Sequence, residues 1–317
     1  MALEPEFKPI LDREKHKRDF DEHFSEVESL LKDITNYGSN LIIRCFASSD
    51  RDLKDSIIIG TFLKQVVAMI DAAEILISNA ALYSSHLQLR AGFEASLFID
   101  WILKDDTHKK ARYFYVSNLR ENKLWAMRTT GASPHQVQFD QIAQEINLQL
   151  EGNIDEIKTE AERQIAEIDR VLSGPSFCDI NNHIQKYKDK NKLRYEPSWY
   201  TPLGVSIRKI ATDVGRLPQY EFIYSHTSTI MHSTKYSHHI QFGNGKLTFE
   251  PIRSLKEIKN AVTFIVGCTL WTYKTILTYY RPEEMQAFVR KYVDDWRNAF
   301  LSIKSVEYST SLDSPTV

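Results

Sequence analysis

Glycine, proline and cysteine are scarce in this chain of 317 residues, and each shortage excludes a class of structure. Only 11 glycines and 10 prolines interrupt the sequence, and the apolar residues between them recur at three- and four-residue spacing rather than in strict alternation. This pattern is typical of helices and not of sheets. The three cysteines, Cys45, Cys178 and Cys268, lie far apart without a Cys-x-x-Cys pair, which argues against a disulfide framework and a thiolate zinc site.

An excess of charge of one sign is also missing. The 40 lysine and arginine residues nearly balance the 42 aspartate and glutamate residues, so no overall field draws the protein to nucleic acid. The N-terminal residues are charged and lack the apolar core of a signal peptide, so we expect a cytoplasmic protein. Two apolar stretches, 56–78 and 261–273, are predicted to be buried helices, because the first contains charged residues and the second is too short to span a membrane. No membrane contact is therefore expected.

Hydrophobic residues make up 42% of the chain, which is ample for a core, and their spacing predicts an all-α fold. We expect a multi-helix bundle that forms a single domain over residues 1–304. The predicted helices cover residues 14–35, 53–79, 85–104, 108–129, 137–172, 178–190, 203–214, 217–237, 255–280 and 283–302. Alternating residues around the turn signal Gly243-Asn244-Gly245 predict one small β-hairpin as the only sheet.

The stretch from Phe139 to Leu172 is heavily charged but keeps isoleucine and leucine residues near helical spacing. It predicts a projecting arm over 137–172, either one long helix or a helical hairpin kinked near Gly152. Two interpretations stay open: a solvated arm packed on one side, or a coiled-coil-like element that joins two copies into a homodimer. The tail over 305–317 is rich in serine and threonine and is expected to be loose.

Four of the ten histidines lie within the twenty residues from Tyr220 to His239. If this segment is helical, Tyr220, Tyr224, Ser228 and His232 line one face, because they recur every four residues. One interpretation is a hydrogen-bonded polar seam in the core. The functional interpretation makes His232 a general acid or base, or a group that contacts phosphate.

Two other kinds of chemistry are disfavoured for this segment. Ser228 and His232 could be a nucleophile and its base, but no G-x-S-x-G elbow accompanies them. The histidines also lack the spacing of an H-E-x-x-H zinc site. We therefore expect neither a metal nor a cofactor.

A second candidate lies in the apolar stretch LQLRAGFEASLFIDWILKD, where Arg90 and Glu94 are four residues apart and meet on one helical face. The pair could simply fix the register of the helix as an internal ion pair. Alternatively, Arg90 offers its planar guanidinium to a phosphate or carboxylate while Glu94 orients it.

The order of these features resembles a known family. Arg90-x-x-x-Glu94, then SWYTPLGVSIRKIATDVG, then the Tyr-x-x-x-Tyr-x-x-x-Ser-x-x-x-His ladder is similar to a bacterial family of helical proteins classified only as a domain of unknown function. The similarity runs from about Asp55 to about Ile303. Because that family has no assigned activity, the resemblance implies a fold and a choice of residues rather than a reaction.

A looser resemblance is to the HEPN superfamily, helical bundles that often act as metal-independent RNases in toxin and phage-defence systems. Those proteins usually carry an arginine shortly followed by a histidine. The two such pairs here, Arg18 with His23 and Arg128 with His135, are as many as chance would give. A HEPN-like site would instead require Arg90 to reach His232 from a separate helix.

Two functions are therefore expected. The first is an intracellular effector of a toxin or antiviral defence system that cleaves RNA, with His232, Arg90, Glu94, Tyr224 and Ser228 as catalytic residues. The second is a non-enzymatic module in which the same residues sense a small anionic ligand, or in which the arm recruits a partner. The possible partners are thus RNA, a small anion or a second copy of the chain.

Overall fold

The computed structural model describes residues 11–49, 51, 57–130, 134–147, 153–232, 235, 238–243 and 246–306. They divide into two compact units: Met1–Asp105 with Ile210–Val317 form unit 1, and Asp106–Lys209 form unit 2. This division differs from the single domain expected over 1–304. The helices between Asp106 and Lys209 pack chiefly on one another.

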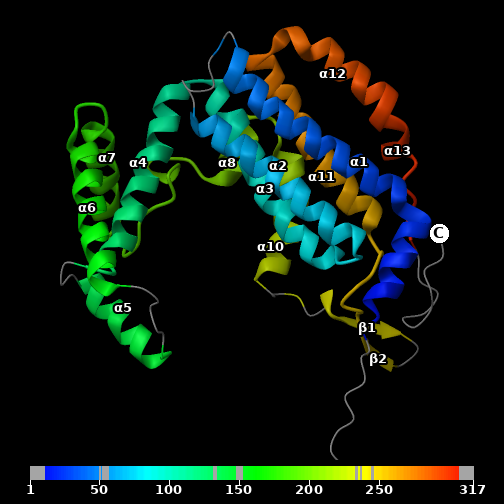
Figure 1. Ribbon diagram of the computed structural model, residues 1–317, viewed down its shortest axis with the longest axis horizontal. Coiled ribbons are helices and arrows are strands. Elements are labelled where there is room, and N and C mark those ends of the chain that lie inside the picture. Colours follow the sequence, from blue (N-terminus) through cyan, green and yellow to red (C-terminus); the bar gives the residue numbers. More distant parts are fainter. Residues whose placement is uncertain are drawn as a thin grey trace, which may run out of the picture. The chain divides into compact units, whose positions relative to one another are not determined.

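Unit 1 is built on four long helices: α1 (Arg13–Ser48), α2 (Ile57–Ser78), α3 (Leu82–Lys104) and α11 (Ile258–Tyr280). Helix α2 packs on α1 and α3, and α11 packs on all three, so the four lie side by side (Figure 1). The shorter elements of this unit are α8 (Ile207–Asp213), which crosses the boundary, α9 (Leu217–Gln219), η3 (Tyr220–Tyr224), α10 (Ser225–Met231), η5 (Pro282–Glu284), α12 (Met285–Lys291), η6 (Tyr292–Trp296) and α13 (Arg297–Leu301).

The core of unit 1 follows from apolar residues at helical spacing. Leu63 and Ile70 of α2, and Val262 and Ile276 of α11, are completely buried. Each such side chain stabilises the fold by about 1.5–3 kcal/mol relative to an exposed one. By length and composition, α11 is the one described helix that is able to cross a membrane. More than half of its most apolar window is buried inside the structure, so its place in the core of unit 1 explains its apolar sequence.

The all-α class is confirmed, but several helix boundaries differ from those predicted. Helix α1 continues to Ser48 rather than ending at residue 35, because Leu41 and Cys45 extend its buried face. The helix predicted over 217–237 runs as α9, η3 and α10 without a gap and ends at Met231. Element η3 is a π-helical turn, so the expected four-residue ladder is not carried by one continuous α-helix.

Two short strands follow the histidine-bearing segment. Strand β1 (Ile240–Gly243) pairs antiparallel with β2 (Lys246–Phe249), with Ile240 opposite Phe249 and Phe242 opposite Leu247. The turn residues on which the hairpin prediction rests, Asn244 and Gly245, lie outside the described residues. The strands are too short to alter the helical class of the unit.

Unit 2 contains α4 (Thr107–Ala126), α5 (Pro134–Glu145), α6 (Ile154–Ser173), α7 (Cys178–Lys190) and the short turn η2 (Thr201–Leu203). Helix α4 packs against α6 and α7. Glu196 joins two of these helices, because it accepts hydrogen bonds from Arg120 of α4 at 2.6 Å and from Lys188 of α7 at 2.6 Å. Burial alone would raise the pKa of Glu196, but these two cations outweigh it and lower the pKa.

The arm predicted over 137–172 is divided in the structure. Helix α6 buries Ala161, Ile168 and Leu172 and packs on α4 and α7, so it belongs to the core of unit 2 rather than projecting from it. Helix α5 has no buried residue. The predicted kink at Gly152 and tail residues 307–317 lie outside the described residues, and Val306, at the start of the predicted tail, is buried.

Gly38 of α1 provides a test of this packing, because a Cβ there would overlap the hydroxyl of Tyr273 and lie 2.7 Å from Val67 Cγ2. Tyr273 is fully buried and donates a hydrogen bond to the carbonyl of Ile34 at 3.1 Å. We expect Gly38→Ala to lower the free energy of unfolding by about 2–3 kcal/mol. The measurement is urea denaturation.

The matched control is Gly267→Ala on α11, where an added Cβ meets nothing within 4 Å. It should leave stability unchanged or raise it by about 0.5–1 kcal/mol, because alanine favours a helix. Equal stabilities for the two variants would contradict the close approach of α1 to α11.

Candidate functional site

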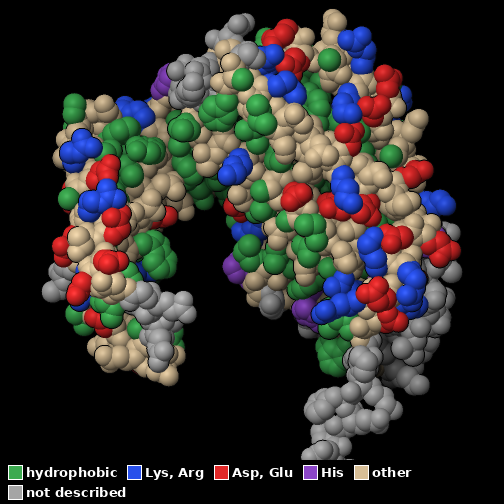
Figure 2. All heavy atoms as spheres, in the orientation of Figure 1, with side chains coloured by type: hydrophobic (Ala, Val, Ile, Leu, Met, Phe, Trp, Pro, Cys, Tyr) green, Lys and Arg blue, Asp and Glu red, His purple; other side chains and the backbone are tan. Residues whose placement is uncertain are grey.

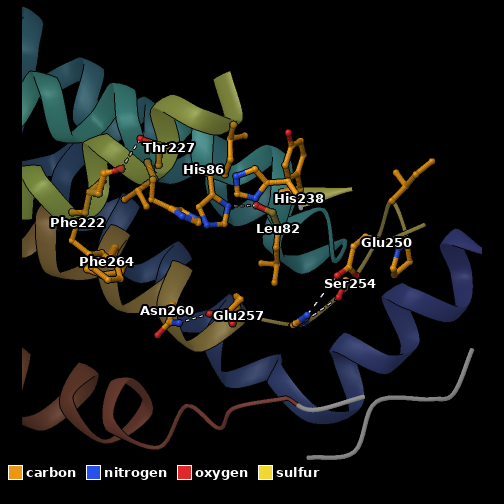
Figure 3. A pocket seen from close by; sticks show the side chains of 18 residues that line it. Leu82, His86, Phe222, Thr227, His238, Glu250, Ser254, Glu257, Asn260 and Phe264 are labelled. Atoms are coloured by element: carbon orange, nitrogen blue, oxygen red, sulfur yellow. Dashed lines mark hydrogen bonds and ion pairs between the residues drawn. The ribbon is translucent and has the colours of Figure 1, made fainter. Parts of the chain in front are cut away.

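Unit 1 contains a cavity of about 400 Å³ next to the histidine-bearing segment. Its walls come from the start of α3, from η3 and α10, from the first turn of α11, and from the residues that follow β2 (Figure 3). The segment after β2 is held against the turn that joins α2 to α3, because Ser254 N donates to the carbonyl of Ala80 at 2.8 Å and Arg253 donates to that of Asn79. These two hydrogen bonds to backbone carbonyls therefore hold this side of the cavity in place.

Three imidazoles lie together on one wall of the cavity. His86 comes from α3, His226 from α10, and His238 from the segment that precedes β1. The ring centroids of His86 and His226 are 5.4 Å apart, and those of His226 and His238 are 5.6 Å apart, both pairs edge to face. Three chain segments thus bring their histidines to one place.

The protonation of His86 follows from its hydrogen bond. Its Nδ1 lies 2.8 Å from the carbonyl oxygen of Leu82, which can only accept, so Nδ1 carries the hydrogen. Burial lowers the pKa of His86, and the bond to Leu82 and the carboxylate of Glu257 oppose this only in part. The ring is therefore neutral at pH 7, and its Nε2 is an acceptor.

His238 is held in a similar way. Its Nε2 lies 2.9 Å from the hydroxyl of Thr229, and that hydroxyl donates to the carbonyl of His226 at 2.7 Å. With the single hydroxyl hydrogen committed, Nε2–H of His238 is the donor and Nδ1 is left as an acceptor. Burial, followed by the charges of neighbouring groups including Lys235, lowers the pKa of His238.

The rest of the lining is mostly apolar with a few charges. The apolar lining residues are Leu82, Leu89, Phe222, Ile223, Ile230, Pro251, Ile252 and Phe264. The charged ones are Glu250, Lys256 and Glu257, and Lys256 lies 3.5 Å from a carboxylate oxygen of Glu250. Such a surface suits a small organic molecule with an apolar body and a polar head.

Three of the five predicted site residues contact one another beside the cavity. Arg90 Nε donates to Glu94 at 3.0 Å, and Arg90 Nη2 donates to the hydroxyl of Tyr224 at 2.8 Å. The guanidinium carbon also lies 4.2 Å from the centre of the Tyr224 ring, and that ring stacks on Tyr220. Arg90 is 8% exposed, and no hydrogen-bond partner of its Nη1 is found among the described residues.

The other two predicted residues lie elsewhere. His232 follows the last residue of α10 and is exposed, and Ser228 is half-buried. None of the five predicted residues lines the cavity. The predicted site left out His86, His226 and His238, although the last two lie in the histidine-rich stretch Tyr220–His239. His86 is four residues before Arg90 on the same face of α3, a spacing that could have indicated it.

An ion pair fixes the segment that carries Tyr220–Met231 to the core. Arg216, which is 1% exposed, donates from Nη1 to Asp100 at 2.9 Å and to Ser96 at 2.6 Å, both on α3. Asp100 also accepts hydrogen bonds from Trp271 at 2.9 Å and Thr275 at 2.8 Å, both on α11. The pair therefore ties the start of α9 to two core helices.

The described residues do not form a recognisable metal site. Among the ranges that the structure describes, no group of three histidine, cysteine or acidic side chains is arranged to hold a metal ion. The cysteine thiols lie apart, and burial raises the pKa of Cys45 to about 11, which makes its thiolate inaccessible at neutral pH.

The described fold is all-α, and unit 1 carries a cavity that is open to solvent, since Phe222 and Ile252 of its lining are exposed. A comparison with protein families shows which family the chain belongs to. It is a family described as "Family of unknown function (DUF5677)", whose model matches residues 55–247. This confirms the resemblance to a family of unknown function, although the match ends before the expected Ile303. No curated protein and no solved structure matches the chain.

The role of the Arg216–Asp100 pair can be tested by Asp100→Asn. Removing the charge leaves a buried guanidinium without its counter-ion, so we expect the free energy of unfolding to fall by about 3 kcal/mol. The control is Asp295→Asn, which removes a surface partner of Lys291 and should cost much less. Comparable losses in urea denaturation would show that the pair does not anchor the segment.

Proposed function

We propose that unit 1 is a ligand-binding module and that the cavity lined by His86, His226 and His238 takes a small organic molecule. The observation that supports this most directly is the composition of the cavity, where a mostly apolar lining carries a few polar groups on separate segments. Its volume of about 400 Å³ is within the usual range for small-molecule sites.

The way the walls are held also supports binding. His86 and His238 each have one ring nitrogen fixed by a hydrogen bond, so their orientation is set before a ligand arrives. Preorganised polar groups lose little freedom on binding and therefore add to affinity. The residues first expected to be catalytic lie outside the cavity, which favours sensing over catalysis.

A fragment library provides the test. Compounds that bind the cavity should raise the melting temperature of the wild-type protein; at ten times Kd the stabilisation is about 1.4 kcal/mol. His86→Ala should abolish the effect of those compounds, because it removes a polar group and enlarges the cavity.

His232→Ala is the matched control for this screen, because His232 is close in sequence to the cavity residues but is exposed and does not line it. It should respond to the compounds as the wild type does. A library without any stabilising compound, or one whose binders protect His86→Ala equally, would contradict the proposal.

RNA cleavage without a metal ion is a second candidate, favoured by the surroundings of Arg90. Its guanidinium is oriented by Glu94 and Tyr224, and its buried Nη1 is a donor that no described residue accepts. In this function His232 would move a proton, as in HEPN-like nucleases. Figure 2 shows basic and acidic side chains intermixed over the face in view, so this face offers no broad attraction for RNA.

This second candidate predicts that the purified protein degrades total RNA in the presence of a chelator. His232→Ala and Arg90→Lys should each slow cleavage by about 100-fold or more, because one removes a proton-transfer group and the other the planar fork. His86→Ala, tested alongside, shows whether the cavity takes part. Intact RNA after incubation with the wild type would end the nuclease interpretation.

A further inference from the structure

Several hydrogen-bond acceptors line the cavity. Nε2 of His86 is an acceptor because Nδ1 holds the hydrogen, and the second nitrogen of His238 is an acceptor for the same reason. Two carboxylates, Glu250 and Glu257, line the opposite side (Figure 3). A ligand with hydrogen-bond donors can bind to these acceptors.

The charges of the lining also favour a ligand that carries hydrogen-bond donors and positive charge. Lys256 is the cation among the lining residues, and Glu250 lies close enough to pair with it. Glu257 then remains as the negative charge of the cavity, with one hydrogen bond from the side-chain amide of Asn260. Two glutamates and one lysine together contribute a net charge of −1 to the lining.

The first turn of α11 lies beside Glu257, and a helix N-terminus by itself would favour an anion. The residue before Ile258 is Glu257, whose carboxylate makes no capping bond to the helix backbone but accepts a hydrogen bond from the side chain of Asn260 in the first turn. Because it supplies negative charge there, a second anion would meet repulsion at close range. The helix end therefore does not convert the cavity into a phosphate site.

Aromatic side chains also line the cavity. Phe222 of η3 and Phe264 of α11 lie with their ring centroids 4.7 Å apart, and Tyr83 of α3 lines the cavity as well. Aromatic faces attract organic cations, and they also pack against a flat apolar body. An apolar molecule with a cationic head would use both properties of the lining.

From these observations we infer that the ligand of the cavity is a small organic amine, with its ammonium group directed to Glu257 and His86 Nε2 and its apolar body against Phe222 and Phe264. The inference rests on the proposed ligand-binding function and adds the chemical class. It differs from the small anion expected from the sequence, because that expectation centred on Arg90, which does not line the cavity.

Three probes with the same ring and different heads test the inference: 2-phenylethylamine, 2-phenylethanol and 3-phenylpropanoate. Their binding is measured on the full chain by titration while the imidazole C–H signals are followed by NMR, with assignments from His86→Ala and His226→Ala. We expect the amine to bind about tenfold more tightly than the alcohol, and the carboxylate to bind more weakly than either.

Glu257→Gln keeps the shape of the side chain and removes its charge, so it should weaken the amine about tenfold and leave the alcohol unchanged. Glu250→Gln is a second variant in case the first fails to fold. Glu283→Gln is the matched control, because Glu283 lies on η5 outside the cavity. It should change none of the three affinities.

The outcomes separate the class of ligand from the binding function. If the carboxylate binds the cavity as tightly as the amine, or if the glutamate variants leave the amine unaffected, the amine inference is overturned while ligand binding stands. If none of the probes moves the cavity imidazole signals, the amine inference fails. The proposed function fails with it only if the fragment library also yields no binder sensitive to His86→Ala.

Discussion

The buried contact between Arg216 and Asp100 is the constraint on which the arrangement around the cavity depends. A guanidinium that is 1% exposed is tolerated only when its N–H groups have acceptors. Gln219 accepts from Nε, Asp100 and Ser96 accept from Nη1, and Cys268 Sγ lies 3.8 Å from Nη2. Because Asp100 also accepts bonds from α11, one carboxylate holds three parts of the chain in register. Residues 217–231 leave this anchor and run along α3, which brings His226 to His86 and Tyr224 to Arg90.

The helices of the core could be predicted from sequence because their stability comes from a repeating apolar face that is visible in the residues themselves. Helix α7 matches its predicted range of 178–190, and α3 and α11 differ from theirs only at their first turns. Segment 217–237 was harder to predict, because its anchor depends on residues far away in the chain and its helix contains a π-helical turn. Arg216 is fixed by α3, and the ladder through Tyr224 passes through a π-helical turn that no local pattern announces.

The candidate site was predictable only where two residues share one helix. Arg90 and Glu94 meet as their four-residue spacing requires, and Tyr224 joins them. The histidine cluster could not be foreseen in the same way, since His86, His226 and His238 come from separate segments and meet through tertiary packing. His232 drew attention by its place in a regular ladder, yet the helix ends one residue before it and leaves it in solvent.

The insertion of unit 2 within the sequence of unit 1 bears on how the protein is made. Helices α1, α2 and α3 leave the ribosome first, but α11, which covers all three, begins only at Ile258. At ordinary translation rates of about 5–20 residues per second, the apolar faces of the first three helices wait on the order of ten seconds for their partner. During that interval the whole of unit 2 is synthesised, while the apolar faces that α11 will cover stay exposed, a condition that favours aggregation and chaperone binding.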